Sequence, residues 1–160
     1  SGGPYPISHS ALGELFVLVF FGLLAVAGSH WLQSESTTLA PWLGGAVVGL
    51  PAAAVLLVNN YRDHEADLRQ GRLTLATRLG DAGAARAYAV MVMLPFGLVL
   101  ALAWAGHTGA MLAWLAIPYA LKLLPQLRRQ ASGAQLNQLL GATAKLGLLL
   151  GLLLSVGVFL

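Results

Sequence analysis

Long apolar runs separated by short polar connections dominate this chain of 160 residues. The runs are rich in Leu, Ala and Gly and lack the strict alternation of a half-buried strand, so they favour helices. We predict helices over five runs, Leu12–Leu32, Leu39–Val58, Ala87–Ala105, Ala110–Leu124 and Leu139–Leu160. A helix needs about 20 residues to cross a bilayer, with a range of about 17 to 25. The run Ala110–Leu124 is too short for this unless it begins near His107.

The composition indicates an integral membrane protein. Hydrophobic residues make up 58% of the chain and charged residues 9%, with a mean hydropathy of +0.75, whereas soluble domains carry about 25% charged residues. Backbone groups in lipid must find hydrogen-bond partners within the protein, which leaves helices or closed barrels. We therefore predict an all-α, polytopic transmembrane helix bundle with five spans. The lipid bilayer is the expected partner, nothing indicates nucleic-acid binding, and the absence of cysteine excludes a thiolate metal site.

Positive charge is concentrated in two of the connections between runs. These connections carry Arg62, Arg69, Arg72, Arg78 and Arg86 after the second run, and Lys122, Arg128 and Arg129 after the fourth. Cytoplasmic loops of membrane proteins carry an excess of Lys and Arg. The pattern therefore predicts a multi-pass topology with the loop around Asp63 in the cytoplasm and the C-terminal Leu160 outside.

The most informative polar stretch is Asn59–Gly80, NNYRDHEADLRQGRLTLATRLG, with three of the six acidic and four of the nine basic residues. Asp63 and Asp67 are four apart, so they share one face of a helix that continues from the preceding run. Asn59 and Asn60 border that face. Carboxylate and amide oxygens suit Mg²⁺, which often completes its shell with waters and phosphate oxygens.

The arginines that follow this face, among them Arg69 and Arg72, suit a multiply charged anion such as a diphosphate, because Arg can bind it bidentately. A structural interpretation competes on spacing alone. In that interpretation the stretch is a cytoplasmic loop with a Glu65–Arg69 ion pair and the usual excess of positive charge.

Three other polar residues are candidates for a cavity near Asp63. Glu14 lies just inside the first run, where it either reaches water at the positive end of a helix or serves a site. Lys145 lies about 9 Å along the last run from Leu139, and it either reaches back to the cytoplasmic surface or faces the cavity. Tyr5 falls towards the same inner side.

The stretch Asn59–Gly80 closely resembles the second aspartate-rich motif of the UbiA superfamily of membrane-embedded aromatic prenyltransferases. Its Asn-Asn-x-x-Asp-x-x-x-Asp form is most like that of the 1,4-dihydroxy-2-naphthoate polyprenyltransferases of menaquinone synthesis. Further stretches that fit this branch are Gly71, Thr74–Ala76, Arg78–Gly80, Gly2–Pro6 before Leu12–Glu14, and Leu136–Asn137 before Thr143–Leu146. The resemblance covers essentially the whole chain.

The resemblance implies a bundle of about nine spans, of which this chain matches the last five. Residues 1–160 would form the C-terminal part of one prenyltransferase domain in a bacterial plasma (inner) membrane, with the N-terminal part missing. The implied enzyme is an Mg²⁺-dependent transferase that moves a polyprenyl group from polyprenyl diphosphate to 1,4-dihydroxy-2-naphthoate. It would give demethylmenaquinone and release CO₂ and diphosphate.

The resemblance also implies roles for residues of the motif. Asp63 and Asp67 would be the catalytic, Mg²⁺-binding residues. Asn59 and Asn60 would support the metal–diphosphate cluster, and Arg69 and Arg72 would meet the diphosphate.

One departure from the family pattern is large. The family's other motif, Asn-Asp-x-x-Asp-x-x-x-Asp, occurs nowhere in the sequence, so we expect this chain alone to be incomplete and inactive. Two alternative functions stay open, namely prenyl transfer to another acceptor such as 4-hydroxybenzoate or a haem vinyl group, and a non-catalytic or transport-type bundle. A lipid head-group phosphotransferase is disfavoured because its Asp-x-x-Asp-Gly start is absent.

Overall fold

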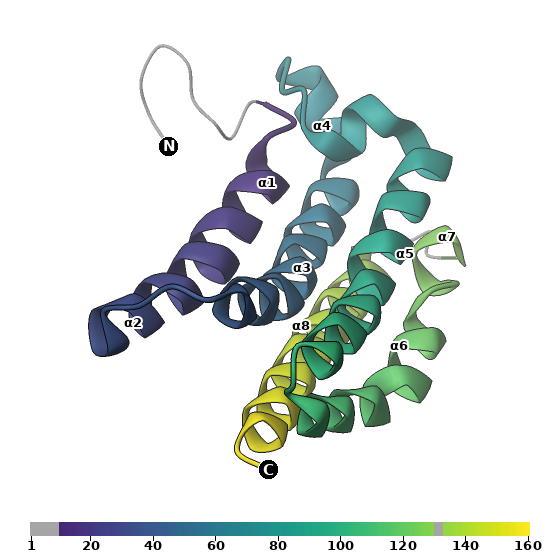
Figure 1. Ribbon diagram of the computed structural model, residues 1–160. Helices are drawn as coiled ribbons and strands as arrows, with labels where there is room; N and C mark the ends of the chain where they lie inside the picture. The colour runs from purple at the N-terminus through teal and green to yellow at the C-terminus, as the bar shows by residue number, and fades with distance from the viewer. Residues whose placement is uncertain (1–9, 130–132) are drawn as a thin grey trace.

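The structure is a computed structural model that describes residues 10–129 and 133–160, and this part of the chain contains helices and no strand. Its elements are α1 (Gly13–Val17), the π-helical η2 (Leu18–Leu24), α2 (Ala25–Ser34), α3 (Leu39–Arg62), α4 (His64–Arg69), α5 (Leu75–Trp104), the 3₁₀-helical η3 (Thr108–Ala116), α6 (Ile117–Leu123), α7 (Gln126–Arg129) and α8 (Gly133–Val158). The long helices lie side by side in a bundle (Figure 1). The predicted all-α membrane bundle is confirmed.

Within the described residues, four helical segments are long and apolar enough to cross a membrane: Gly13–Ser34, Leu39–Arg62, Leu75–Trp104 and Gly133–Val158. The fifth, Thr108–Leu123, is shorter, and it starts beside His107 as its predicted length required. Its first part, η3, is a 3₁₀-helix, which rises about 2.0 Å per residue instead of about 1.5 Å. The whole segment therefore reaches about 28 Å, close to the hydrocarbon thickness of about 30 Å.

The start of α5 differs most from the sequence prediction. The helix begins at Leu75 rather than Ala87, because Thr74 caps it by accepting a hydrogen bond from Thr77 N (3.4 Å). The charged residues Arg78 and Asp81 shorten the apolar run here, and the helix is kinked between them. The break in helical geometry comes at Gly80, with φ 62° and ψ −177°, a conformation open essentially to glycine alone.

Close backbone contact holds the first span against α3. A Cβ added at Gly22 would lie 2.5 Å from Gly45 O, and one added at Gly49 would lie 2.8 Å from Gly22 Cα. Small residues allow membrane helices to gain van der Waals contact along their backbones. The α3 helix also packs against α5 and α8, so it is the central element of the described bundle.

The two Arg- and Lys-bearing connections lie at one end of the bundle, which we call the motif end. The connection through α4 and the connection through α7 are both at this end, and the C-terminus is at the other (Figure 1). The chain therefore crosses the bundle in alternating directions, as the five-span topology requires. The assignment of the motif end to the cytoplasm stays a prediction.

Candidate functional site

The aspartate-rich stretch lies where α3 passes into α4. The α3 helix ends at Arg62, and Asp63 is the junction residue, with φ −97° and ψ 5°. Backbone hydrogen bonds continue across it, from Asp63 N to Asn59 O (3.2 Å) and from Asp67 N to Asp63 O (2.9 Å). Hydrogen bonding therefore continues from α3 into α4, but the predicted single helix is interrupted at Asp63. The two carboxylates also have different surroundings.

The Asp63 carboxylate is paired with its neighbour Arg62. Arg62 donates from Nε to Oδ1 (2.8 Å) and from Nη2 to Oδ2 (2.7 Å). The Asp63 side chain is 42% exposed, so it stays open to a ligand. Hydrogen bonding to Arg62 lowers the pKa of Asp63 below its ordinary value, despite some loss of hydration.

The same guanidinium connects two further residues. Arg62 Nη2 donates to Asn59 Oδ1 (3.0 Å), and Arg62 Nη1 donates to Asn137 Oδ1 (2.7 Å). Asn137 lies in the first turns of α8, so Arg62 ties the end of α3 to the start of α8. Sequence reasoning treated Arg62 only as a topology signal. The contact of Arg62 with Asn59 could have been predicted, because residues three apart on a helix are neighbours. The contact with Asn137 could not, because no local sequence pattern connects the two residues.

The Asp67 carboxylate is almost fully buried and is paired with Arg72. Arg72 Nη1 lies 2.8 Å from Asp67 Oδ1, and the Asp67 side chain is 4% exposed. The backbone explains this proximity. Gly71, with φ +70°, ends α4 in a Schellman motif, in which Gly71 N donates to Leu68 O (3.1 Å) and Arg72 N to Asp67 O (2.9 Å). This turn brings residue 72 back beside residue 67.

Glu14 contacts Asn60, which lies next to Asn59 in the aspartate-rich stretch. Asn60 Nδ2 donates to Glu14 Oε1 over 2.9 Å, and the two residues are 9% and 2% exposed respectively. The contact links the start of the first span to the last turn of α3. The interpretation of Glu14 as a carboxylate near water is therefore wrong, because the packing of α1 against α3 buries it.

The structure does not bring the other predicted residues into contact with Asp63 or Asp67. Arg69 and Lys145 are exposed, on α4 and α8 respectively. No polar contact joins either to the aspartates within residues 10–129 and 133–160, so their roles stay predictions. Tyr5 lies outside the described residues.

The donor atoms present suit Mg²⁺. Asp63 and Asp67 supply carboxylates and Asn59 an amide oxygen, which are hard oxygen ligands, and Mg²⁺ commonly takes one or two carboxylates together with substrate phosphates. In the part of the chain that the structure describes, no three His, Asp or Glu side chains gather to hold a metal ion. These residues therefore fit a site in which other groups complete the shell.

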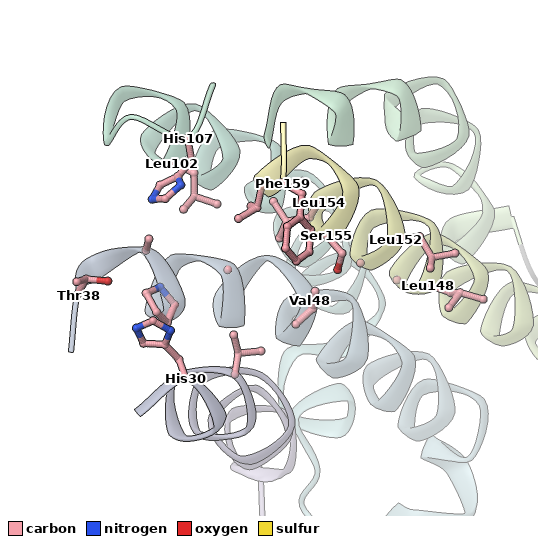
Figure 2. Close-up of a pocket in the computed structure, with 17 residues that line it drawn as sticks. His30, Thr38, Val48, Leu102, His107, Leu148, Leu152, Leu154, Ser155 and Phe159 are labelled. Atoms are coloured by element: carbon pink, nitrogen blue, oxygen red, sulfur yellow. The ribbon is translucent and has the colours of Figure 1, made fainter. Parts of the chain in front are cut away.

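A cavity of about 640 Å³ lies among the helices (Figure 2). Its lining includes Thr38, just before α3, and Phe159, just after α8, at the ends of these helices that are farthest from the motif. Its walls come from the first span, α3, the end of α5 and α8. They include His30, Thr38, Leu102, His107, Leu154 and Phe159. The lining is mostly apolar, which suits a hydrocarbon chain better than a charged group.

Residues 5–149 match the UbiA prenyltransferase family. The chain belongs to this family. The all-helical fold is therefore that of a UbiA-type membrane bundle.

Several curated relatives of this UbiA family member align with almost the whole chain. The 1,4-dihydroxy-2-naphthoate octaprenyltransferase of Escherichia coli (strain K12) is 36% identical over 163 residues, which cover 99% of this chain and 52% of the relative. The Mycobacterium tuberculosis protein of the same name is 35% identical, over 89% of this chain and 49% of the relative. UbiA prenyltransferase domain-containing protein 1 of Homo sapiens is 35% identical, over 99% and 46%. The chain spans about half the length of these relatives.

Proposed function

We propose that this UbiA family member takes part in the Mg²⁺-dependent transfer of a polyprenyl group from polyprenyl diphosphate to 1,4-dihydroxy-2-naphthoate, in a bacterial inner membrane. The products would be demethylmenaquinone, CO₂ and diphosphate. The observation that carries the proposal is the pair Asp63 and Asp67 on successive helical turns, among arginines, at one end of an apolar bundle. The names of the bacterial relatives support the choice of acceptor.

Different residues of the motif would bind the metal ion and the diphosphate. Asp63 and Asp67 would hold the metal, and Asn59 would add an amide oxygen. When bound, Mg²⁺ would neutralise charge on the departing diphosphate. Arg62 and Arg72 hold the two carboxylates in place, and Arg72, together with the exposed Arg69, would meet diphosphate oxygens.

In the proposed reaction the allylic C–O bond of the polyprenyl diphosphate breaks. The new C–C bond forms at the ring carbon that bears the carboxylate, and this carboxylate leaves as CO₂. The apolar cavity supports a long hydrocarbon substrate. Val48, which lines it, lies 11 residues before Asn59 on α3, or about 17 Å along the helix axis.

We further propose that the active unit needs a second aspartate-rich cluster from outside these 160 residues. Two carboxylates can hold only part of a Mg²⁺–diphosphate complex, and this chain spans about half of each relative. We expect the chain alone to insert without showing prenyl transfer. Co-expression with an N-terminal half that carries the other motif should restore some activity, because each half forms its helices in the bilayer before they associate.

The test is an assay in membranes from a strain that lacks its own enzyme, with the full-length protein that contains this chain. We expect Mg²⁺-dependent conversion of 1,4-dihydroxy-2-naphthoate and a polyprenyl diphosphate, and loss of product with a chelator. A preference for 4-hydroxybenzoate would replace the acceptor in the proposal. No transfer to either acceptor by well-inserted protein would favour a non-catalytic bundle.

A further inference from the structure

We propose that Glu14 is a positioning residue that acts through Asn60 and fixes which edge of the Asn60 carboxamide faces the aspartate cluster. This inference rests on the proposed function. It assigns a role to a carboxylate that lies in the first span, far in sequence from the motif. The group it controls lies one turn of helix before Asp63.

The chemistry of the contact sets its direction. A carboxylate oxygen accepts hydrogen bonds, and a carboxamide has a donor edge and an acceptor edge. Glu14 Oε1 therefore takes the Nδ2 edge of Asn60, at 2.9 Å. The Oδ1 edge of Asn60 must then point away from Glu14, which leaves it for another donor or for a cation.

The pair is poorly suited to a purely stabilising role. Glu14 is 2% exposed, and its Oε2 has no hydrogen-bond partner among the residues that the structure describes. A buried carboxylate oxygen without a partner costs free energy. Well-packed apolar side chains in place of buried charged groups are often neutral or stabilising. The polar contact is thus better explained by the orientation it gives to Asn60.

The surrounding packing keeps Glu14 in place. A Cβ added at the preceding residue, Gly13, would lie 3.2 Å from Leu56 Cδ2 of α3. Further along the first span, a Cβ added at Gly22 would lie 2.5 Å from Gly45 O of α3. Because the two backbones are fixed against each other, the Asn60 carboxamide has little freedom other than rotation, and Glu14 controls that rotation.

The test compares three variants of the full-length protein: Glu14→Leu, Asn60→Asp and the double variant Glu14→Gln/Asn60→Asp. We expect Glu14→Leu to lower kcat by about 100-fold, the scale of a small misplacement of a reacting group, with KM for the aromatic acceptor unchanged. Its thermal midpoint in detergent should equal or exceed that of the wild type. A purely structural role would instead lower stability and activity together.

The double variant tests the polarity of the contact. Asn60→Asp alone places two carboxylates side by side. Its activity should fall at least as much as that of Glu14→Leu. Adding Glu14→Gln lets the new amide donate to the new carboxylate, so most activity should return. Glu65→Gln, at an exposed position of α4, is the matched control and should behave as wild type. Failure of the double variant to recover would overturn the inference.

A second measurement separates this inference from the proposed function. Binding of inorganic diphosphate with Mg²⁺ to the purified full-length protein should be about 10-fold weaker in Glu14→Leu, if lost orientation costs about 1.4 kcal/mol. Equal binding and equal kcat in this variant would contradict the positioning role alone. An inactive wild type would contradict the proposed function, and the diphosphate measurement would still decide the role of Glu14.

Discussion

Arg72 contacts Asp67 twice, through its backbone N–H and through its guanidinium. The backbone nitrogen donates to Asp67 O over 2.9 Å, and Nη1 lies 2.8 Å from Oδ1. The turn at Gly71 makes the first contact, and that contact places the side chain for the second. The turn at Gly71 thus places the Arg72 guanidinium where it is the counter-ion of the buried Asp67 carboxylate.

Replacing Arg72 should therefore destabilise the protein. In Arg72→Gln the buried carboxylate loses its charged partner, and we expect the free energy of unfolding to fall by about 1–3 kcal/mol. The measurement is thermal unfolding in detergent. Arg69→Gln is the matched control, because Arg69 is exposed on the same helix. Equal shifts in the two variants would contradict a structural role for the Arg72–Asp67 pair.

Neutralising either aspartate should abolish prenyl transfer in the full-length protein. Asp63→Asn and Asp67→Asn each remove a charge that would hold the metal, and we expect a loss of at least about 100-fold, as for other electrostatic deletions. Turnover is measured at saturating Mg²⁺, with insertion checked by membrane fractionation. Glu65→Gln should be far milder. Wild-type turnover in either aspartate variant would exclude it from the metal site.

The pH dependence of the site should respond to Arg62. The guanidinium lowers the pKa of Asp63, so the stabilising charge is present above the ordinary Asp pKa of about 3.9. It is lost only as pH falls through the lower folded value. In Arg62→Gln that pKa should rise, and the acid limb of the activity profile should move to higher pH. If the acid limb of the Arg62→Gln activity profile lies at the same pH as in the wild type, protonation of Asp63 does not limit activity in acid.

The sidedness of the bundle can be tested at His64, the first residue of α4. A cysteine introduced there should react with a membrane-impermeant thiol reagent only from the cytoplasmic side, because the arginine-rich connection is expected to stay inside. The natural chain has no cysteine, so it serves as the blank. Reaction from outside intact cells would reverse the topology and move the site with it.

The glycine contact between the first span and α3 predicts a position-specific effect. A Cβ at Gly49 would lie 2.8 Å from Gly22 Cα, so Gly49→Ala forces the backbones apart and should cost about 1–3 kcal/mol. Gly28 has nothing within 4 Å of such a Cβ, and Gly28→Ala is the control. Comparable thermal stability of the two variants would show that the close approach does not matter.

Hydropathy predicted the spans well where apolar residues were unbroken, and less well at α5. There the charged Arg78 and Asp81 hid a helix that begins at Leu75, because hydropathy reports lipid contact and not backbone hydrogen bonding. The Arg72–Asp67 contact was accessible in principle, since a Gly just after a helix marks a Schellman turn. The Glu14–Asn60 contact was not, because it joins residues 46 apart through packing that no local pattern encodes.

The bend at Gly80 has a consequence for how a substrate would reach the site. The first turn of α5 runs across the motif end before the rest of the helix descends (Figure 1). Leu68, Leu73 and Leu79, before and within this turn, are all exposed. Leucines at this level are suited to the boundary between lipid head groups and acyl chains, which would set the aspartates at the depth of the lipid phosphates. A polyprenyl diphosphate would then arrive by lateral diffusion with its head group already at that depth, and the proposed reaction would follow its surface density in the bilayer rather than its bulk concentration.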